Sequence, residues 1–194
     1  MLSDTFIDWW FAPWSYAVNI PARLQPAADL LARRDQYGFW CAEAGVQTDF
    51  PDDFDPGWQV AAVHAQAELR KAAELFCGLI AARAQDQSVL SLLPISERRW
   101  CMSIAGTQPL KGCAEVTFLP ADPLEVRGLT ELASCLEHGF PGIWTRLRLL
   151  LPEPLANRVE TLLPVQRRSA AGSAVRAQRC WQMCHAHAAS LTAS

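Results

Sequence analysis

The run from Cys180 to His187 contains the side chains best suited to chemistry in this chain. On a helix, Cys180, Cys184 and His187 would lie at positions i, i+4 and i+7 on one face. Thiolate sulfur and imidazole nitrogen are ligands that zinc prefers, but a structural zinc site normally has four of them. The sequence contains no second pair of the Cys-x-x-Cys or His-x-His type. We therefore expect no bound metal and predict that the cysteines pack on the apolar face of a terminal helix; a zinc site at these three residues is the alternative.

No segment offers the arrangement needed for covalent catalysis. A serine or cysteine nucleophile requires a nearby base and an oxyanion hole, which a glycine-flanked turn often signals. The run Ser103–Gly106 lacks that spacing, no glycine-rich phosphate-binding loop is present, and no carboxylate pairs recognisably with a histidine. The sequence predicts a protein that is not an enzyme and uses no cofactor.

A further group of oxygen ligands lies at residues 48–57, where four aspartates are mixed with two prolines and a final glycine. The prolines exclude both a regular helix and a central strand, so we expect an acidic surface loop. Asp52, Asp53 and Asp55 do not have the alternating register, central glycine and closing glutamate of a calcium-binding loop. Calcium binding is therefore not expected.

An aromatic cluster occupies the N-terminal segment, residues 1–25. Its members are Phe6, Trp9, Trp10, Phe11, Trp14 and Tyr16. Large aromatic rings of this kind either plug a core or form the centre of a protein interface. We expect the segment to pack on the rest of the chain with most rings buried, Phe11 and Tyr16 among them, and with Trp9 or Trp10 left for a partner. Trp9, Trp10 and Trp14 are accordingly candidate partner-binding residues.

Charge is unevenly distributed along the sequence. Residues 1–64 contain nine acidic and three basic residues, a net charge of −6, whereas residues 144–194 contain seven arginines and two glutamates, a net charge of +5. Either the two ends lie side by side and partly neutralise each other, or they form surfaces of opposite sign for two partners. On the second interpretation, Arg146, Arg148, Arg167 and Arg168 are candidate partner-binding residues.

Length and composition limit the class of protein. The chain has 194 residues, 51% of them apolar, which suits one helical domain spanning residues 1–194. A net charge of −3 gives no general attraction to nucleic acid, and no apolar run reaches the ~18 to 20 residues of a membrane span. Seven dispersed cysteines do not resemble a disulfide framework, and the acidic N-terminus does not resemble a signal peptide. We expect a cytoplasmic protein.

Apolar periodicity predicts a mainly α fold, a compact irregular multi-helix domain with at most a short β element. The expected helices cover residues 25–36, ended by Gly38; 58–84, with His64 as a core residue; 87–93; 96 to about 106, capped by Ser96; 124–137; 154–163; and a final helix to about 189. Residues 110–120 and 143–151 alternate in a way that permits a strand or a helix.

Two short stretches resemble a known family. The run Phe11-Ala-Pro13-Trp-Ser-Tyr16 is similar to the Phe-x-Pro-x-x-Tyr motif of the K-subunit (SctK/YscK-like) family of bacterial type III secretion systems. The run from Trp144 to Pro152 resembles the family's tryptophan followed by an Arg-Leu-rich run and a proline. The overall length and the Ala/Leu-rich helical centre also match.

The resemblance implies a non-enzymatic adaptor in the sorting platform of the injectisome, at the cytoplasmic face of the bacterial inner membrane. Its partners would be the cytoplasmic domain of the inner-membrane ring and the C-ring-like pod subunit, and it would reach the membrane only through them. A type III secretion chaperone or regulatory binding protein is the alternative. The acidic loop and the Cys-His tail match no family motif.

Overall fold

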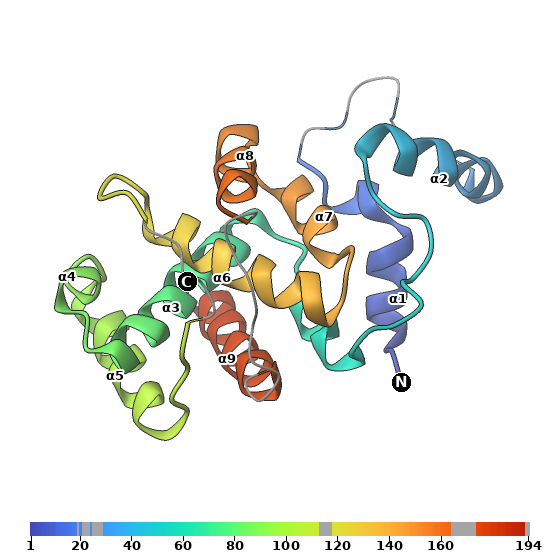
Figure 1. Ribbon diagram of the computed structural model, residues 1–194. Helices are drawn as coiled ribbons and strands as arrows, with labels where there is room; N and C mark the ends of the chain where they lie inside the picture. The colour runs from blue at the N-terminus through green and yellow to red at the C-terminus, as the bar shows by residue number, and fades with distance from the viewer. Residues whose placement is uncertain (19, 21–23, 25–28, 113–117, 164–173, 193–194) are drawn as a thin grey trace.

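The protein is mainly helical in the computed structural model, which describes residues 1–18, 20, 24, 29–112, 118–163 and 174–192 (Figure 1). The α-helices are α1 (Asp4–Phe11), α2 (Leu30–Ala44), α3 (Gln66–Ala84), α4 (Gln87–Leu90), α5 (Ile95–Thr107), α6 (Leu124–Gly139), α7 (Ile143–Leu147), α8 (Glu153–Leu162) and α9 (Ala174–Thr192). Three 3-10 helices accompany them: η1 (Pro13–Ser15), η3 (Pro56–Ala61) and η4 (Arg148–Leu150). The described residues contain no strand, so the predicted fold class is confirmed.

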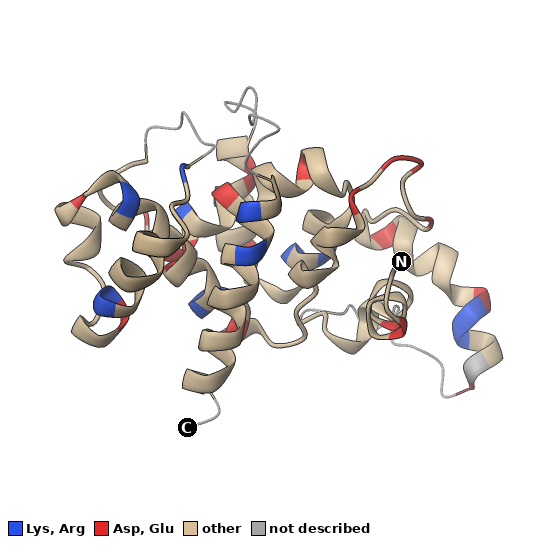
Figure 2. Ribbon diagram, turned by 90° about the horizontal axis from the view of Figure 1, so that it is seen from below, with Lys and Arg blue, Asp and Glu red and all other residues tan. Residues whose placement is uncertain are grey.

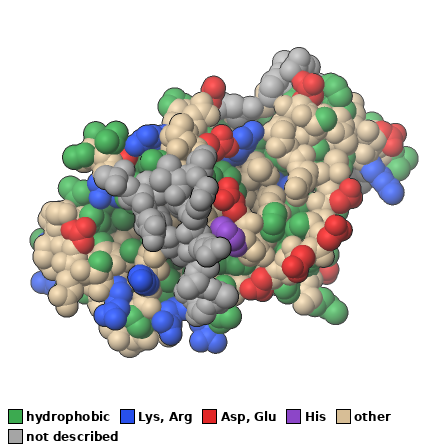
Figure 3. Space-filling view, in the orientation of Figure 1, with side chains coloured by type: hydrophobic (Ala, Val, Ile, Leu, Met, Phe, Trp, Pro, Cys, Tyr) green, Lys and Arg blue, Asp and Glu red, His purple; other side chains and the backbone are tan. Residues whose placement is uncertain are grey.

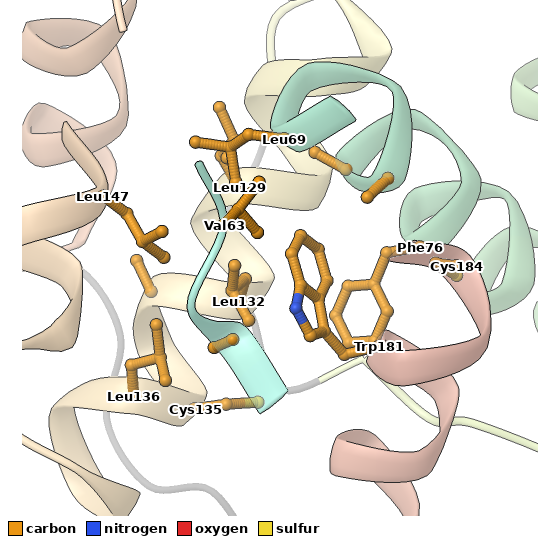
Figure 4. Packing of buried hydrophobic residues seen from close by; sticks show 14 of the residues in the cluster. Val63, Leu69, Phe76, Leu129, Leu132, Cys135, Leu136, Leu147, Trp181 and Cys184 are labelled. Atoms are coloured by element: carbon orange, nitrogen blue, oxygen red, sulfur yellow. The ribbon is translucent and has the colours of Figure 1, made fainter. Parts of the chain in front are cut away.

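The core is built where α3 packs between α6 and α9 (Figure 4). Leu69 and Phe76 of α3 meet Leu129 and Leu132 of α6, and Trp181 of α9 lies edge-on to Phe76 with ring centroids 5.5 Å apart. Each large side chain removed from water in this way contributes about 1.5 to 3 kcal/mol. This apolar centre is the main source of stability.

A glycine sets the distance between α3 and α6. A Cβ atom added at Gly128 of α6 would overlap the backbone carbonyl of Ala73 on α3. Only glycine allows two helix backbones to approach this closely. The crossing of α3 and α6 therefore depends on residue 128.

The remaining helices surround this centre (Figure 1). Helices α4 and α5 pack along α3 at one end of the molecule, α8 covers α6, and α1 and α2 lie at the opposite end. None of the helices in the described part of the chain has the length and apolar content needed to span a membrane.

The helix expected at residues 25–36 is wrong in its bounds. Helix α2 begins after Asp29, whose carboxylate caps the N–H of Ala32, and it continues through Gly38 to Ala44. It ends at Gly45, which has the left-handed conformation, φ 66°, that glycine adopts without strain. Gly38 is tolerated because a Cβ atom there would meet nothing within 4 Å. Residues 25–28 lie outside the described residues.

The long helix expected at residues 58–84 is divided in two. Asp55 caps the N–H of Gly57 and starts η3, and the chain is extended between η3 and α3. His64 lies in this connection and is exposed, so its prediction as a core helix residue is wrong. Its ring meets only the edge of Tyr16, with centroids 6.4 Å apart.

Two other predictions are settled by the described residues. Helix α5 begins at Ile95 directly after Pro94, so Ser96 is not its cap, and it passes through Gly106. Residues 143–150 are helical rather than extended, as α7 followed by η4. The centre of the ambiguous run 110–120, residues 113–117, lies outside the described residues.

Candidate functional site

The N-terminal aromatic cluster is folded into the protein, and it buries the two residues that were expected to face a partner. Trp9 is 1% and Trp10 0% exposed, because the amphipathic α1 directs positions 6, 9 and 10 inward. The indole N–H of Trp9 donates to the carbonyl of Val63 at 2.9 Å, and the Trp9 ring stacks on Tyr16 at 5.0 Å. As partner-binding residues, Trp9 and Trp10 are therefore corrected to core residues.

The exposed members of the cluster are different from those expected. Phe11 is 39% exposed, although its ring still lies 5.6 Å from that of Tyr37. Trp14 is half-buried against Trp40 of α2, at 6.1 Å and nearly perpendicular. Of the three tryptophans considered as candidates, only Trp14 keeps a surface that a partner could touch.

Arg146 is fully buried and holds four segments together. Its guanidinium lies 3.4 Å from the centre of the Trp10 ring, and its Nε donates to the Trp10 carbonyl at 3.2 Å. Its Nη2 donates to the carbonyl of Gln47 at 2.6 Å and to the hydroxyl of Tyr37 at 3.2 Å, while Nη1 reaches the Gly142 carbonyl at 3.4 Å. We call this group the Arg146 junction; it fastens α1, α2 and Gln47, the residue that precedes the acidic loop, to α7.

The electrostatics of the Arg146 junction are unusual for a buried cation. No carboxylate among the described residues pairs with Arg146, so carbonyl dipoles, the Tyr37 hydroxyl and the Trp10 ring balance the charge. Burial lowers the pKa of Arg146 and raises that of Tyr37. Arginine remains charged even so, because its ordinary pKa is far above neutrality. Arg146 is thus a structural residue, and its prediction as a surface contact is corrected.

Arg148 plays a related part on the other side of α2. Its Nη1 pairs with Glu160 of α8 at 2.6 Å, and its Nη2 donates to the carbonyl of Ala44 at 3.4 Å. The side chain is one-third exposed, so part of its surface stays available. Arg167 and Arg168 lie outside the described residues.

Residues that flank the first family-like stretch, Phe11–Tyr16, contact the second one. The N–H of Val18, two residues beyond Tyr16, donates to the carbonyl of Leu149 at 2.9 Å, and Arg146 covers Trp10 beside Phe11. Residues that are separated by more than a hundred positions in the chain thus form one packed unit. Their shared role is to hold the N-terminal segment in place.

The candidate zinc ligands point in different directions. Cys180 and Cys184 are fully buried, and desolvation raises the pKa of Cys180 to about 11 and that of Cys184 well above its usual value. The His187 ring instead stacks on Trp100 of α5 at 4.5 Å. Among the described residues, no three histidine, cysteine or acidic side chains are grouped to hold a metal ion. The cysteines pack in the core as predicted.

Exposed charge is unevenly distributed over the surface (Figures 2 and 3). The exposed acidic residues of α1 and of the loop at residues 48–55 are Asp4, Asp8, Asp49, Asp52 and Asp53, and the exposed arginines at the end of α3, on α5 and at the start of α9 include Arg83, Arg99, Arg176 and Arg179. The two groups adjoin where Gln178 of α9 donates to Asp55 at 2.6 Å. We call them the acidic surface and the basic surface.

The two ends of the chain lie side by side, as one interpretation of the sequence charge expected, since Arg146 packs on Trp10 and Gln178 bonds to Asp55. Of the described C-terminal arginines, Arg148 pairs with Glu160 and Arg158 with Asp122, which lie outside the acidic segment 1–64.

The sequence predicts the basic surface in the C-terminal third alone. That prediction misses Arg83 and Arg99, which come from the middle of the chain. The sequence feature that could have indicated a surface on α5 is the spacing of Ile95, Arg99 and Met102, which places them on one helical face.

Comparison with models of protein families, with curated proteins and with solved structures finds nothing that matches this chain.

Proposed function

We propose that this protein is a non-enzymatic cytoplasmic adaptor of a type III secretion sorting platform. It links the cytoplasmic domain of the inner-membrane ring to the C-ring-like pod subunit. The observation that carries the proposal is the uneven distribution of exposed charge, with an acidic surface over α1 and the loop and a basic surface over α5 and the start of α9 (Figure 3). Surfaces of opposite sign suit a connector, because each attracts a different partner and orients it.

The identity of the partners comes from the resemblance to the K-subunit family. The proximity of the two stretches supports this step, because Trp10 and Val18, which flank Phe11–Tyr16, contact Arg146 and Leu149 of the second stretch. It also changes the expected contacts. Buried Trp9, Trp10 and Arg146 support the framework, and the contacts belong to the exposed residues of the two charged surfaces.

Co-purification with the two proposed partners tests the proposal. Charge reversal at the acidic surface, Asp52→Lys with Asp53→Lys, is expected to reduce capture of one partner at least tenfold. Reversal at the basic surface, Arg176→Glu with Arg179→Glu, is expected to reduce capture of the other. Two further variants are tested in the same assay, because the sequence analysis named their sites as candidate partner-binding residues. They are Arg167→Glu with Arg168→Glu, and Trp14→Ala.

The matched control is a reversal outside the residues of both charged surfaces, Arg34→Glu on the exposed face of α2. It should leave both captures unchanged. The proposal is wrong if the folded variants of both surfaces retain both partners, with folding checked by circular dichroism. A small dimer that binds an extended segment of a secreted protein would favour the chaperone alternative.

A further inference from the structure

Helix α5 presents an apolar stripe to solvent at the basic surface. Ile95 is 65% and Met102 54% exposed, and they lie seven residues apart on one face with Arg99 between them. Leu92, just before the helix, is 61% exposed. Scattered apolar residues are normal on a surface, but three large exposed ones on α5 and the turn before it indicate a contact site.

A groove adjoins this stripe. It has a volume of about 460 Å³ and lies between the end of α3, α4 and α5, with Arg83, Leu90, Met102, Ala105 and Gly106 among its lining residues. Met102 belongs to both the stripe and the groove, so the two form one continuous surface. A Cβ atom added at Gly106 would meet nothing within 4 Å, which shows that this part of the groove is open. We call the stripe and groove together the α5 face.

The charges around the α5 face are predominantly positive. Arg83 and Arg99 are exposed, and neither pairs with a carboxylate among the described residues. The nearby carboxylates are already engaged: Glu97 is buried and bonds to Lys71, and Asp86 caps α4 through the N–H groups of Ser88 and Val89. A ligand with negative groups on either side of an apolar strip would complement this surface.

We propose that the α5 face binds an acidic amphipathic helix of a partner protein. Apolar side chains of that helix at positions i, i+3 or i+4 and i+7 would cover Ile95 and Met102 and enter the groove, and its flanking carboxylates would face Arg83 and Arg99. The stripe from Ile95 to Gly106 is about 17 Å long at 1.5 Å per residue, which accommodates roughly three turns of a docked helix. The inference rests on the proposed adaptor function and specifies what its basic surface recognises.

Fluorescence anisotropy with the full-length protein and a labelled peptide tests the inference. The probe is an amphipathic peptide of about 16 residues with leucine at helical spacing and glutamate on both flanks, and its control has the same composition in scrambled order. The expected result is a dissociation constant on the order of 10 µM for the amphipathic peptide, weakening with added salt, and at least tenfold weaker binding of the scrambled one.

Two matched glycine substitutions place the binding site. Gly106→Glu adds a charged side chain inside the groove, whereas Gly38→Glu adds the same side chain to α2 at the other end. Both glycines are helical and exposed, and an added Cβ atom meets nothing within 4 Å at either. Gly106→Glu and Arg99→Glu should each weaken binding at least tenfold, and Gly38→Glu should not change it.

The remaining outcomes either overturn the inference or separate it from the proposed function. Equal binding of the two peptides, or unchanged binding to Gly106→Glu, excludes the α5 face as a helix-binding site. Self-association that Gly106→Glu abolishes would assign the face to the acidic surface of a second copy, which sedimentation at increasing concentration detects. If the peptide binds but neither secretion partner co-purifies, the proposed secretion partners are wrong and this inference stands. If the partners co-purify but the peptide does not bind, this inference is wrong and the proposed function stands.

Discussion

The α3–α6–α9 core and the Arg146 junction hold their parts of the molecule together by different means. In the core, apolar side chains interlock, and Gly128 lets two backbones approach closely (Figure 4). At the junction, one cation reaches the carbonyls of Trp10, Gln47 and Gly142 and the hydroxyl of Tyr37. The core therefore depends on close packing among many residues, whereas the junction depends on one side chain.

The core and the Arg146 junction also differ in how many side chains carry each attachment. In the core, close packing is shared among many side chains, so no single side chain holds it together. At the junction, several directional hydrogen bonds to α1, α2 and Gln47 share one donor side chain and fail together when that donor is removed.

The largest expected effect is at the helix crossing. Gly128→Ala should lower the free energy of unfolding by at least about 4 kcal/mol or prevent folding, because the new methyl group overlaps the backbone of Ala73 and two helices must separate. Denaturation in urea, followed by circular dichroism, measures the effect.

Gly38→Ala is the matched control for that substitution. It lies inside α2 with open space around it and should be neutral or stabilising by up to about 1 kcal/mol, since alanine favours helix over glycine. If Gly128→Ala were as well tolerated as Gly38→Ala, close packing at the crossing would not be what holds the core together.

An intermediate effect is expected at the junction. Arg146→Lys keeps the charge but cannot reach the same four oxygen atoms, so we expect a loss of about 3 kcal/mol. Hydrogen exchange should accelerate in α1, α2 and the acidic loop and stay slow in α3, α6 and α9. The surface substitution Arg83→Lys serves as control. Uniform acceleration across all helices would contradict the distinction between the two regions.

The smallest effect concerns a carboxylate on the rim of the core. Asp122 accepts from Arg158 at 2.8 and 2.9 Å and from the N–H of Leu119 at 2.7 Å, and the bonds from Arg158 are the main cause that lowers its pKa. Asp122→Asn should cost about 1 kcal/mol at neutral pH. Because folding lowers this pKa below its usual 3.8, the stabilisation is present above that value and is lost as the pH falls through the folded-state pKa.

Urea titrations across pH distinguish the two regions. The difference between the wild type and Asp122→Asn should be constant above about pH 5 and disappear in acid. The effect of Arg146→Lys should persist in acid, since no carboxylate among the described residues pairs with Arg146. A pH-dependent effect of Arg146→Lys would show that the junction also relies on an acidic group.

The helical fold could be predicted because apolar periodicity is local. Helices α6 and α8 were placed within two residues of their observed bounds, since each buries one clear face. The division near His64 could not be seen, because Ala-Val-His-Ala fits a helix as well as a connection. What decides it is Asp55, which caps η3 and accepts a hydrogen bond from Gln178 of α9 at 2.6 Å.

The candidate site was harder to predict, since burial of a charged residue depends on distant parts of the chain. An arginine in a basic segment is ordinarily a surface residue. Arg146 is buried because acceptors from residues 10, 37, 47 and 142 converge on it, and their positions follow only from the complete fold. The spacing of Ile95 and Met102 places them on one helical face, but this spacing is the same for an exposed face and a buried one, so their exposure follows only from the fold.

The Arg146 junction also sets an order in which the newly made chain can mature. The hydrogen bond from Arg146 to Trp10 joins residues 136 positions apart, so the first helix is synthesised long before the residue that covers it. At ~5 to 20 residues per second, Trp9 and Trp10 wait on the order of 10 s beside the ribosome without their final shielding. Over that interval the aromatic segment is a hydrophobic target for cellular chaperones, and truncated chains that end before residue 146 would keep it exposed.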